Sequence, residues 1–219
     1  MRGTRTFIAL PLPRNLAAAC LAWIGELKSR GVDARWVTEE ELHITLAFLG
    51  ELKTTEVVET CRQTTRVASQ TDSFVLGLNG IGFFPSPKRP RILWAGLDRG
   101  MQETTALQEQ LSQVLVRENL YRVEDRPFHP HVTLGRLNEC TTEQAEILHS
   151  DFRHHKTPVG RIETCTVMES VPGNKPRYAS MATCPLVPSP GKSKYSQSSG
   201  QLIPKTGSPG LSKTGRANA

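Results

Sequence analysis

The chain has 219 residues, of which 37% are hydrophobic, and carries a formal net charge of +6. This length suits one domain with a sizeable core. No stretch approaches the roughly 20 apolar residues of a membrane span. The five cysteines are scattered and form no Cys-x-x-Cys pair, which argues against a disulfide framework or a zinc site. Residues 188–219 hold five Lys or Arg and no Asp or Glu. Because this segment carries most of the net positive charge, that charge does not by itself indicate a nucleic-acid-binding fold.

Apolar periodicity and turn residues predict strands alternating with helices. In chain order we expect a strand at 4–12, a helix at 14–30, a strand at 42–49, a helix at 54–69, strands at 74–78 and 91–97, a helix at 101–118, a strand at 130–135, a helix at 141–148, and closing strands at 161–168 and 178–186. Thr54 is the predicted N-cap of the second helix, with Val57, Val58 and Cys61 facing inward.

This mixture predicts an α+β domain over residues 1–187. Residues 188–219 are mostly Ser, Gly, Pro and Lys. Such a segment has few large apolar side chains to bury, so we expect a disordered basic tail with weak, salt-sensitive affinity for RNA at most.

The pattern His-x-Thr-Leu occurs twice, at 43–46 and 131–134. Side chains alternate between the faces of a strand. His43 and Thr45 therefore share one face, as do His131 and Thr133, and apolar residues occupy the other; Phe48 falls on the apolar side by the same rule. The repeat indicates two similar halves related by a pseudo-two-fold axis. Two imidazoles and two hydroxyls around one cleft suit phosphodiester chemistry.

The surroundings of both copies form an ordered series of motifs spanning roughly residues 4–186. These motifs are RTFIALPL at 5–12, WV at 36–37, ELHITLAFLG at 41–50, GIGFFP at 80–85, PRILWAG at 90–96 and RPFHPHVTLGR at 126–136. In them the chain resembles the 2H phosphoesterase superfamily, and within it the RNA 2′,3′-cyclic phosphodiesterases, also called 2′-5′ RNA ligases. It departs from the family in its longer C-terminal tail and in residues 168–178, which match only loosely.

The resemblance implies a bilobal α+β fold in which two antiparallel sheets form a central groove and helices pack outside. It implies hydrolysis of RNA 2′,3′-cyclic phosphate ends to 2′-phosphates, with 2′-5′ ligation as the reverse reaction. In this reading His131 is the general base that activates water, and His43 is the general acid. Thr45 and Thr133 can donate to the phosphate oxygens, and no metal or cofactor is expected.

Arg136 has two interpretations. By strict alternation it lies on the apolar side, so either the strand ends at Gly135 and the arginine is on the surface, or a glycine bulge turns it into the cleft. In the cleft its guanidinium would bind phosphate.

Other residues are candidates for RNA contacts by stacking or by charge. They are Phe7, Phe84, Phe128, Lys88, Arg89 and Arg91. A core position is the competing interpretation for each phenylalanine, and a solvated loop for each cation.

His129 raises a metal alternative, because His129 and His131 have a metal-ligand spacing and could join His43 in a three-histidine site. Pro130 and the lack of a nearby carboxylate argue against it. Two further alternatives are an RNA-end-binding module with little turnover, and a phosphodiesterase acting on small cyclic phosphates or 2′,5′-oligonucleotides. We expect a cytoplasmic monomer that has no membrane association and acts on RNA with a 2′,3′-cyclic phosphate end, such as a tRNA fragment.

Overall fold

The computed structural model describes residues 3–123, 125–171, 173 and 177–189. The strands are β1 Thr4–Pro11, β2 Asp33–Trp36, β3 His43–Leu52, β4 Phe74–Phe84, β5 Ile92–Arg99, β6 Val132–Glu139, β7 Gly160–Ile162, β8 Thr164–Ser170 and β9 Tyr178–Pro185. The helices are α1 Arg14–Ser29, the short 3-10 helix η1 Glu39–Glu41, α2 Thr54–Ala68, α3 Met101–Arg117 and α4 Thr142–Phe152. The predicted α+β class is confirmed.

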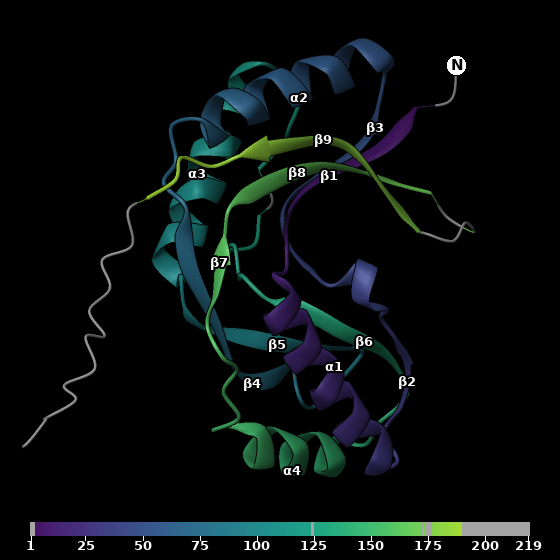
Figure 1. The fold of residues 1–219 in the computed structure, drawn as a ribbon. Helices are drawn as coiled ribbons and strands as arrows, with labels where there is room; N and C mark the ends of the chain where they lie inside the picture. Colours follow the sequence, from purple (N-terminus) through teal and green to yellow (C-terminus); the bar gives the residue numbers. More distant parts are fainter. Residues whose placement is uncertain (1–2, 124, 172, 174–176, 190–219) are drawn as a thin grey trace, which may run out of the picture. The chain divides into compact units, whose positions relative to one another are not determined.

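The described strands pair into one curled sheet in the order β7-β4-β5-β6-β3-β1-β8-β9, with β2 on the edge of β6 (Figure 1). All of these strand pairs are antiparallel. The two predicted sheets are therefore two halves of one sheet. They meet where Ile44 of β3 pairs with Val132 of β6, so the two motif strands form the junction between the halves.

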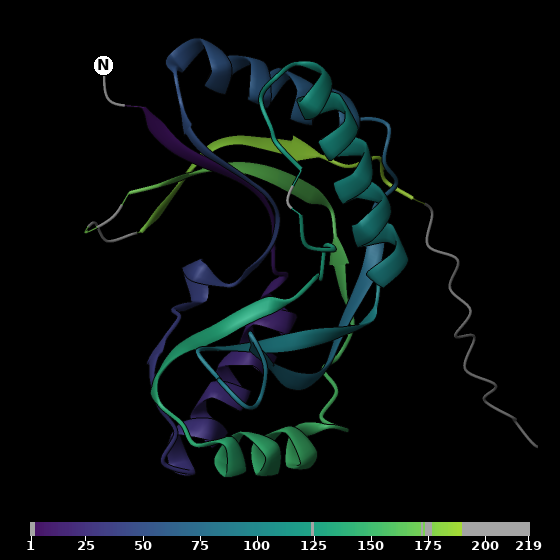
Figure 2. The same cartoon turned by 180° about the vertical axis from the view of Figure 1, so that it is seen from behind.

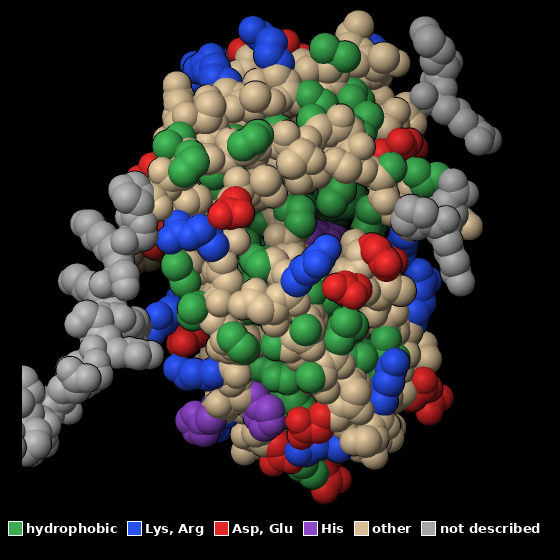
Figure 3. Space-filling view, in the orientation of Figure 1, with side chains coloured by type: hydrophobic (Ala, Val, Ile, Leu, Met, Phe, Trp, Pro, Cys, Tyr) green, Lys and Arg blue, Asp and Glu red, His purple; other side chains and the backbone are tan. Residues whose placement is uncertain are grey.

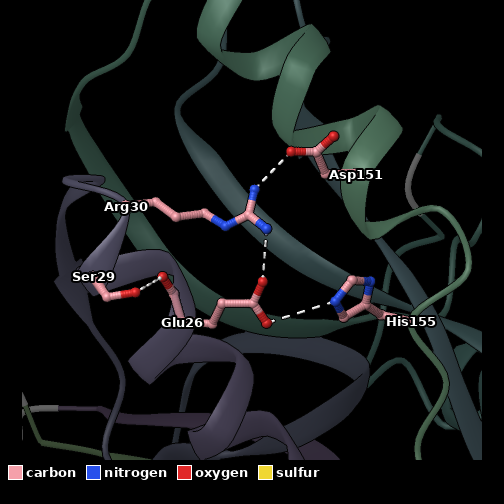
Figure 4. A network of polar contacts seen from close by, with 5 residues as sticks. All are labelled: Glu26, Ser29, Arg30, Asp151 and His155. Atoms are coloured by element: carbon pink, nitrogen blue, oxygen red, sulfur yellow. Dashed lines mark hydrogen bonds and ion pairs between the residues drawn. The ribbon is translucent and has the colours of Figure 1, made fainter.

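The helices divide between the halves. Helices α2 and α3 pack beside each other against the half that contains β1, β3, β8 and β9, whereas α1 and α4 contact β7 and β4 of the other half (Figures 1 and 2). A polar network joins α1 to α4: the Arg30 guanidinium donates to Asp151 at 2.6 Å and to Glu26 at 2.8 Å, and the His155 ring lies 3.6 Å from the Glu26 carboxylate (Figure 4). Arg30, the C-cap residue of α1, thus links this helix to Asp151 of α4, and His155, three residues past α4, lies beside Glu26.

Details of the second helix differ from expectation. Lys53, not Thr54, is its N-cap, and the Lys53 backbone N–H donates to the Glu56 carboxylate at 2.6 Å, so the helix start is satisfied without the threonine. Val57 is buried, but Val58 is 64% exposed. One residue on a helix turns by about 100°, which carries Val58 off the buried stripe.

Three further differences concern which elements are present. β2 and η1 were not predicted, and the strand expected at 161–168 is divided into β7 and β8. The sequence also predicts a hairpin around residues 172–174, of which Pro172 and Asn174 lie outside the described residues, as does nearly all of the predicted tail. In the described part of the chain, no helix combines the length and apolar character needed to cross a membrane.

The apolar residues of the two motifs lie in the core. Ile44, Val132 and Leu134 are fully buried and Leu46 is 2% exposed, as the alternation rule predicts. Burial of this set fixes the register, because a slip by one residue would exchange every side chain between the two faces. The imidazole and hydroxyl side chains are thereby held on the opposite, concave face.

Candidate active site

The two motifs are related by the pairing of β3 with β6. Because Ile44 lies opposite Val132 in an antiparallel pair, His43 comes opposite Thr133 and Thr45 opposite His131. Directly opposite Cβ atoms are about 4.5–5.5 Å apart and diagonal ones about 7–8 Å. The two histidines therefore occupy one diagonal of this four-residue site, with Cβ atoms about 7–8 Å apart by strand geometry.

Both imidazoles are held in the same way. The His43 ring Nδ1 lies 2.7 Å from the carbonyl oxygen of Glu41, and the His131 ring Nδ1 lies 2.7 Å from that of His129. A carbonyl only accepts, so each Nδ1 carries a proton and donates it. In each neutral ring Nε2 is then unprotonated; in His43 it lies 3.1 Å from the Thr45 hydroxyl. The bond to the carbonyl two residues back repeats in both copies and sets both rings in the tautomer that a base requires.

Burial controls the charge of these rings. It lowers the pKa of His43 to about 4, with the neighbouring His131 adding to the effect, while the bond to Glu41 opposes it. Burial also lowers the pKa of His131, opposed by its bond to the His129 carbonyl. Both histidines of the free protein are therefore neutral at pH 7, and an anion between them would raise both pKa values by favouring the imidazolium.

Aromatic rings flank each histidine. The Phe7 and Tyr178 rings lie 5.2 and 5.4 Å from the His43 ring. On the other side, the Phe84 and Trp94 rings lie 4.9 and 6.0 Å from His131. These contacts desolvate the imidazoles and limit their rotation.

The three phenylalanines that the sequence offered for RNA contacts have different surroundings in the structure. Phe7 is 2% exposed and packs beside His43, so it has little surface left for a base. Phe128 is half-buried and packs against the core. Phe84 is half-buried at His131, where it stacks on Trp94 with ring centres 5.1 Å apart. The core interpretation therefore holds for Phe7 and Phe128.

A bulge lies at the last residue of each motif. The pairing of β1 with β3 skips Leu46, and the pairing of β5 with β6 skips Leu134. The extra residue reverses the alternation. Phe48 was expected on the apolar side, which is wrong: it is 63% exposed. Arg136 holds the equivalent place, five residues after His131, and is exposed as well. Of its two interpretations, the structure adopts the bulge.

Phe48 and Arg136 line the same cavity as the motif residues, with a volume of about 320 Å³. Its lining includes His43, Thr45 and Thr133, whereas His131 lies on the Phe84 and Trp94 side of the site. Figure 3 shows this face hollowed, with a histidine at the bottom and charged side chains on the rim.

The cavity is basic. Four arginines and one acidic residue line it: Arg5, Arg35, Arg136, Arg177 and Glu41. Of these, only Arg136 was singled out from the sequence. Arg35 lies on the unpredicted strand β2 and Arg177 just before β9, where no local pattern marks them. Tyr178, which also lines the cavity, was read only as the first residue of a closing strand.

The remaining candidates lie outside this cavity. Lys88, Arg89 and Arg91 are exposed in or next to the β4–β5 loop, and none of them lines it. His129 is exposed, and its ring is 4.8 Å from that of Trp94. Among the described residues, no three His, Cys, Asp or Glu side chains are grouped to hold a metal ion, so the three-histidine alternative has no support from the geometry.

Comparison with known proteins identifies relatives of this chain. The family described as LigT like phosphoesterase matches residues 10–94 and 97–178. The RNA 2′,3′-cyclic phosphodiesterase of Geobacillus stearothermophilus is 30% identical over 199 residues, covering 87% of this chain and 60% of that protein. The protein of the same name from Thermotoga maritima is 33% identical over 136 residues, covering 61% of this chain and 70% of that protein. The chain thus spans less than two thirds of the Geobacillus relative.

Solved structures share the fold. The apo structure of LigT from E. coli has a TM-score of 0.66 at 23% identity and covers 85% of this chain and 99% of its own. The protein TT0787 of Thermus thermophilus has a TM-score of 0.68 at 26% identity, covering 86% and 99%. The curled sheet with its four helices is therefore a fold seen before.

Proposed function

This chain belongs to the LigT-like phosphoesterase family, and we propose that it hydrolyses the 2′,3′-cyclic phosphate at the 3′ end of RNA, leaving a 2′-phosphate and a 3′-hydroxyl. One observation carries the proposal: two histidines and two threonines share one face at the β3–β6 junction, and both imidazoles are fixed by the same backbone bond. Curated relatives named RNA 2′,3′-cyclic phosphodiesterase support the choice of substrate.

In the proposed reaction, the cyclic phosphate lies between the two Nε2 atoms. His131 takes a proton from water as its oxygen attacks phosphorus opposite the ribose O3′. The P–O3′ bond breaks, and His43 gives its Nε2 proton to O3′. His131 ends protonated and His43 neutral, and exchange with solvent restores both. The two imidazoles supply both proton transfers, so the proposal requires no metal ion.

Binding of substrate changes the charge of the acid. His43 has a pKa of about 4 in the free protein, and the charge of a bound phosphodiester raises this pKa, so that the ring takes up the proton that it gives to O3′. The hydroxyls of Thr45 and Thr133 donate to the non-bridging oxygens, where negative charge builds up in the transition state. Run in reverse with an RNA 5′-hydroxyl in place of water, the same groups would form a 2′-5′ linkage.

The exposed ring of Phe48 is the best-placed aromatic for the terminal base, because it is 63% exposed and lines the cavity that contains His43. Base-on-ring stacking is how proteins often hold single-stranded RNA ends. It takes the stacking role for which the sequence offered Phe7, Phe84 and Phe128 as candidates.

The test is hydrolysis of uridine 2′,3′-cyclic phosphate and of an RNA oligonucleotide ending in a 2′,3′-cyclic phosphate, both in EDTA, with the position of the product phosphate read by ³¹P NMR. His43→Ala and His131→Ala should each lower turnover by about 10²-fold or more. Thr45→Ala and Thr133→Ala should cost less, because each removes one donor among several.

His154→Ala is the matched control, since His154 is exposed and lies two residues after α4, away from the cavity. Wild-type turnover in either active-site histidine variant would contradict the mechanism, and activity that is lost in EDTA but restored by zinc or manganese would contradict the metal-independent chemistry.

A further inference from the structure

The cavity has a second polar end, where three neighbouring strands lie side by side. Ser170 of β8 pairs with Tyr178 of β9, and Glu169 of β8 pairs with Thr6 of β1. Continuing the antiparallel register of β1 and β8 by one residue brings Arg5 opposite Ser170. Arg5, Ser170 and Tyr178 therefore form one row across the sheet, and all three line the cavity.

Arg177 extends this row just before β9. Its carbonyl oxygen accepts from the Val171 backbone N–H at 2.9 Å, and its side chain also lines the cavity. The carbon at the centre of its guanidinium lies 5.8 Å from the centre of the Tyr178 ring, and the Tyr178 ring lies 5.4 Å from the ring of His43. One aromatic side chain therefore separates this guanidinium from the candidate general acid.

Arg5 lines the cavity although a carboxylate lies opposite it. In the pairing of β1 with β3, Arg5 faces Glu51, an arrangement that favours a cross-strand ion pair. The two side chains nevertheless make no ion pair, and Glu51 does not line the cavity. Within the described part of the chain, Arg177 has no ion pair either. Both guanidinium groups can therefore bind an anion in the cavity.

The four arginines of the cavity form two pairs in different halves of the sheet. Arg35 and Arg136 lie opposite each other on β2 and β6. Arg5 and Arg177 lie in the other half, which also carries His43. A cyclic phosphodiester between the two motifs carries one negative charge, which does not balance both pairs. Because guanidinium groups suit bidentate contacts with phosphate, the second pair fits a second phosphate on the His43 side.

The proposed reaction places the ribose of the terminal nucleotide on this side. His43 gives its proton to O3′, so the ribose lies between phosphorus and the half of the sheet that carries His43. The C5′ atom of that ribose bears the next phosphate of an RNA chain. A base stacked on Phe48 lies at the same end, because Phe48 pairs with Phe7 of β1, two residues from Arg5. Base, ribose and 5′-phosphate can therefore bind there together.

We propose that Arg5 and Arg177, with the hydroxyl of Ser170 on the strand between them, bind the 5′-phosphate of the terminal nucleoside. In RNA this group is the phosphodiester that joins the last two nucleotides. The inference rests on the proposed function and narrows its substrate class to RNA ends and to nucleotides that carry a 5′-phosphate, in preference to a nucleoside 2′,3′-cyclic phosphate alone. It leaves Arg136 to the reacting phosphate.

The experiment measures binding of two product-like ligands, adenosine 2′-monophosphate and adenosine 2′,5′-bisphosphate, by titration calorimetry at fixed salt. In the wild-type protein the bisphosphate should bind about 10-fold or more tightly, because charge-assisted hydrogen bonds to a second phosphate are among the strong ones. Arg5→Gln and Arg177→Gln should each lose most of this ratio and keep the affinity for the monophosphate.

Two further variants locate the effect. Arg66→Gln is the same change at an exposed arginine in the last turn of α2, and it should leave both affinities unchanged. Arg136→Gln removes a guanidinium from the other half of the cavity. It should weaken binding of both ligands alike, because both carry the 2′-phosphate, and so should keep the ratio.

A wild-type ratio below about 5 would overturn the proposal. So would ratios that stay above half of the wild-type value in both Arg5→Gln and Arg177→Gln, or a ratio that is lost only in Arg136→Gln. Should one of the two variants fold poorly, the other gives an independent reading. Neither ligand is turned over, so a protein that shows the ratio but no hydrolysis would refute the proposed function alone, and one that hydrolyses without the ratio would refute this inference alone.

Discussion

His43 should make the stability of the protein depend on pH. Its pKa is lowered from 6.5 to about 4 by burial, so between these values the unfolded chain binds a proton that the folded chain does not. Stability therefore rises with pH across this window and is lost as pH falls from 6.5 toward 4. A pKa lowered from 6.5 to about 4 changes the free energy of unfolding by about 3 kcal/mol between pH 7 and pH 4.

The perturbation is His43→Asn, since an asparagine amide can still donate to the Glu41 carbonyl that accepts from Nδ1 but does not titrate. Urea unfolding followed by circular dichroism at pH 4 to 8 gives the free energy of unfolding of both proteins. The free energy of unfolding of the wild type minus that of the variant should fall by about 3 kcal/mol from pH 7 to pH 4. Loss of ring packing adds an offset that does not vary with pH, so only the slope is diagnostic.

The exposed His154→Asn serves as the control and should leave the slope unchanged. A His43→Asn variant with the same pH slope as the wild type would refute the reasoning, because it would mean that the His43 ring titrates as if in water. The site would then be open to solvent rather than enclosed by Phe7 and Tyr178.

Phe48→Ala should raise the KM for RNA with a cyclic phosphate end by about 5-fold to 100-fold with little change in kcat, since one stacked base is worth about 1–3 kcal/mol; an unchanged KM in steady-state kinetics would contradict the stacking role. Gly82→Ala should destabilise the protein by about 1–3 kcal/mol in urea unfolding, because the new Cβ would overlap the Trp94 ring, whereas Gly77→Ala on the same strand meets only ordinary contacts; equal stability of the two variants would count against this packing. Removing residues 190–219 should leave the melting temperature unchanged, because that segment has few large apolar side chains, and should weaken binding only to long RNA at low salt through the loss of five positive charges; a large fall in melting temperature would show that the segment packs on the domain.

Strand alternation correctly predicted the part of the site nearest each histidine. Ile44, Leu46, Val132 and Leu134 are buried, and the histidines and threonines face the other way. The rule works there because a two-residue repeat needs only an uninterrupted strand. The element types at most positions were predictable for a similar reason, since they depend on local periodicity and turn residues.

Alternation fails immediately after each motif, where the bulges at Leu46 and Leu134 turn Phe48 and Arg136 into the cavity. A glycine at 135 hinted at one bulge, but the equivalent position in the first copy is Ala47, which gives no warning. Bulges depend on how a strand meets its neighbour, so a single segment of sequence does not encode them clearly.

Arg35 was missed for a different reason. Strand β2 has four residues, none of them fully buried, so it shows neither an apolar alternation nor a strong strand composition. Its position is set by pairing with β6, whose residues lie about 100 positions further along the chain. A contact of that kind depends on the tertiary fold and leaves no local pattern to read.

The differences between the two copies of the His-x-Thr motif matter most for function. A repeat alone would make the two histidines equivalent, and equivalent groups could not be assigned as acid and base. At the place five residues after each histidine, one copy presents the aromatic Phe48 and the other the cationic Arg136, and both line one cavity. In the proposed reaction, a terminal base stacked on Phe48 and a phosphate bound by Arg136 would hold the nucleotide in one orientation. That orientation would direct O3′ toward one histidine and the attacking water toward the other, and would thereby give two similar side chains different roles.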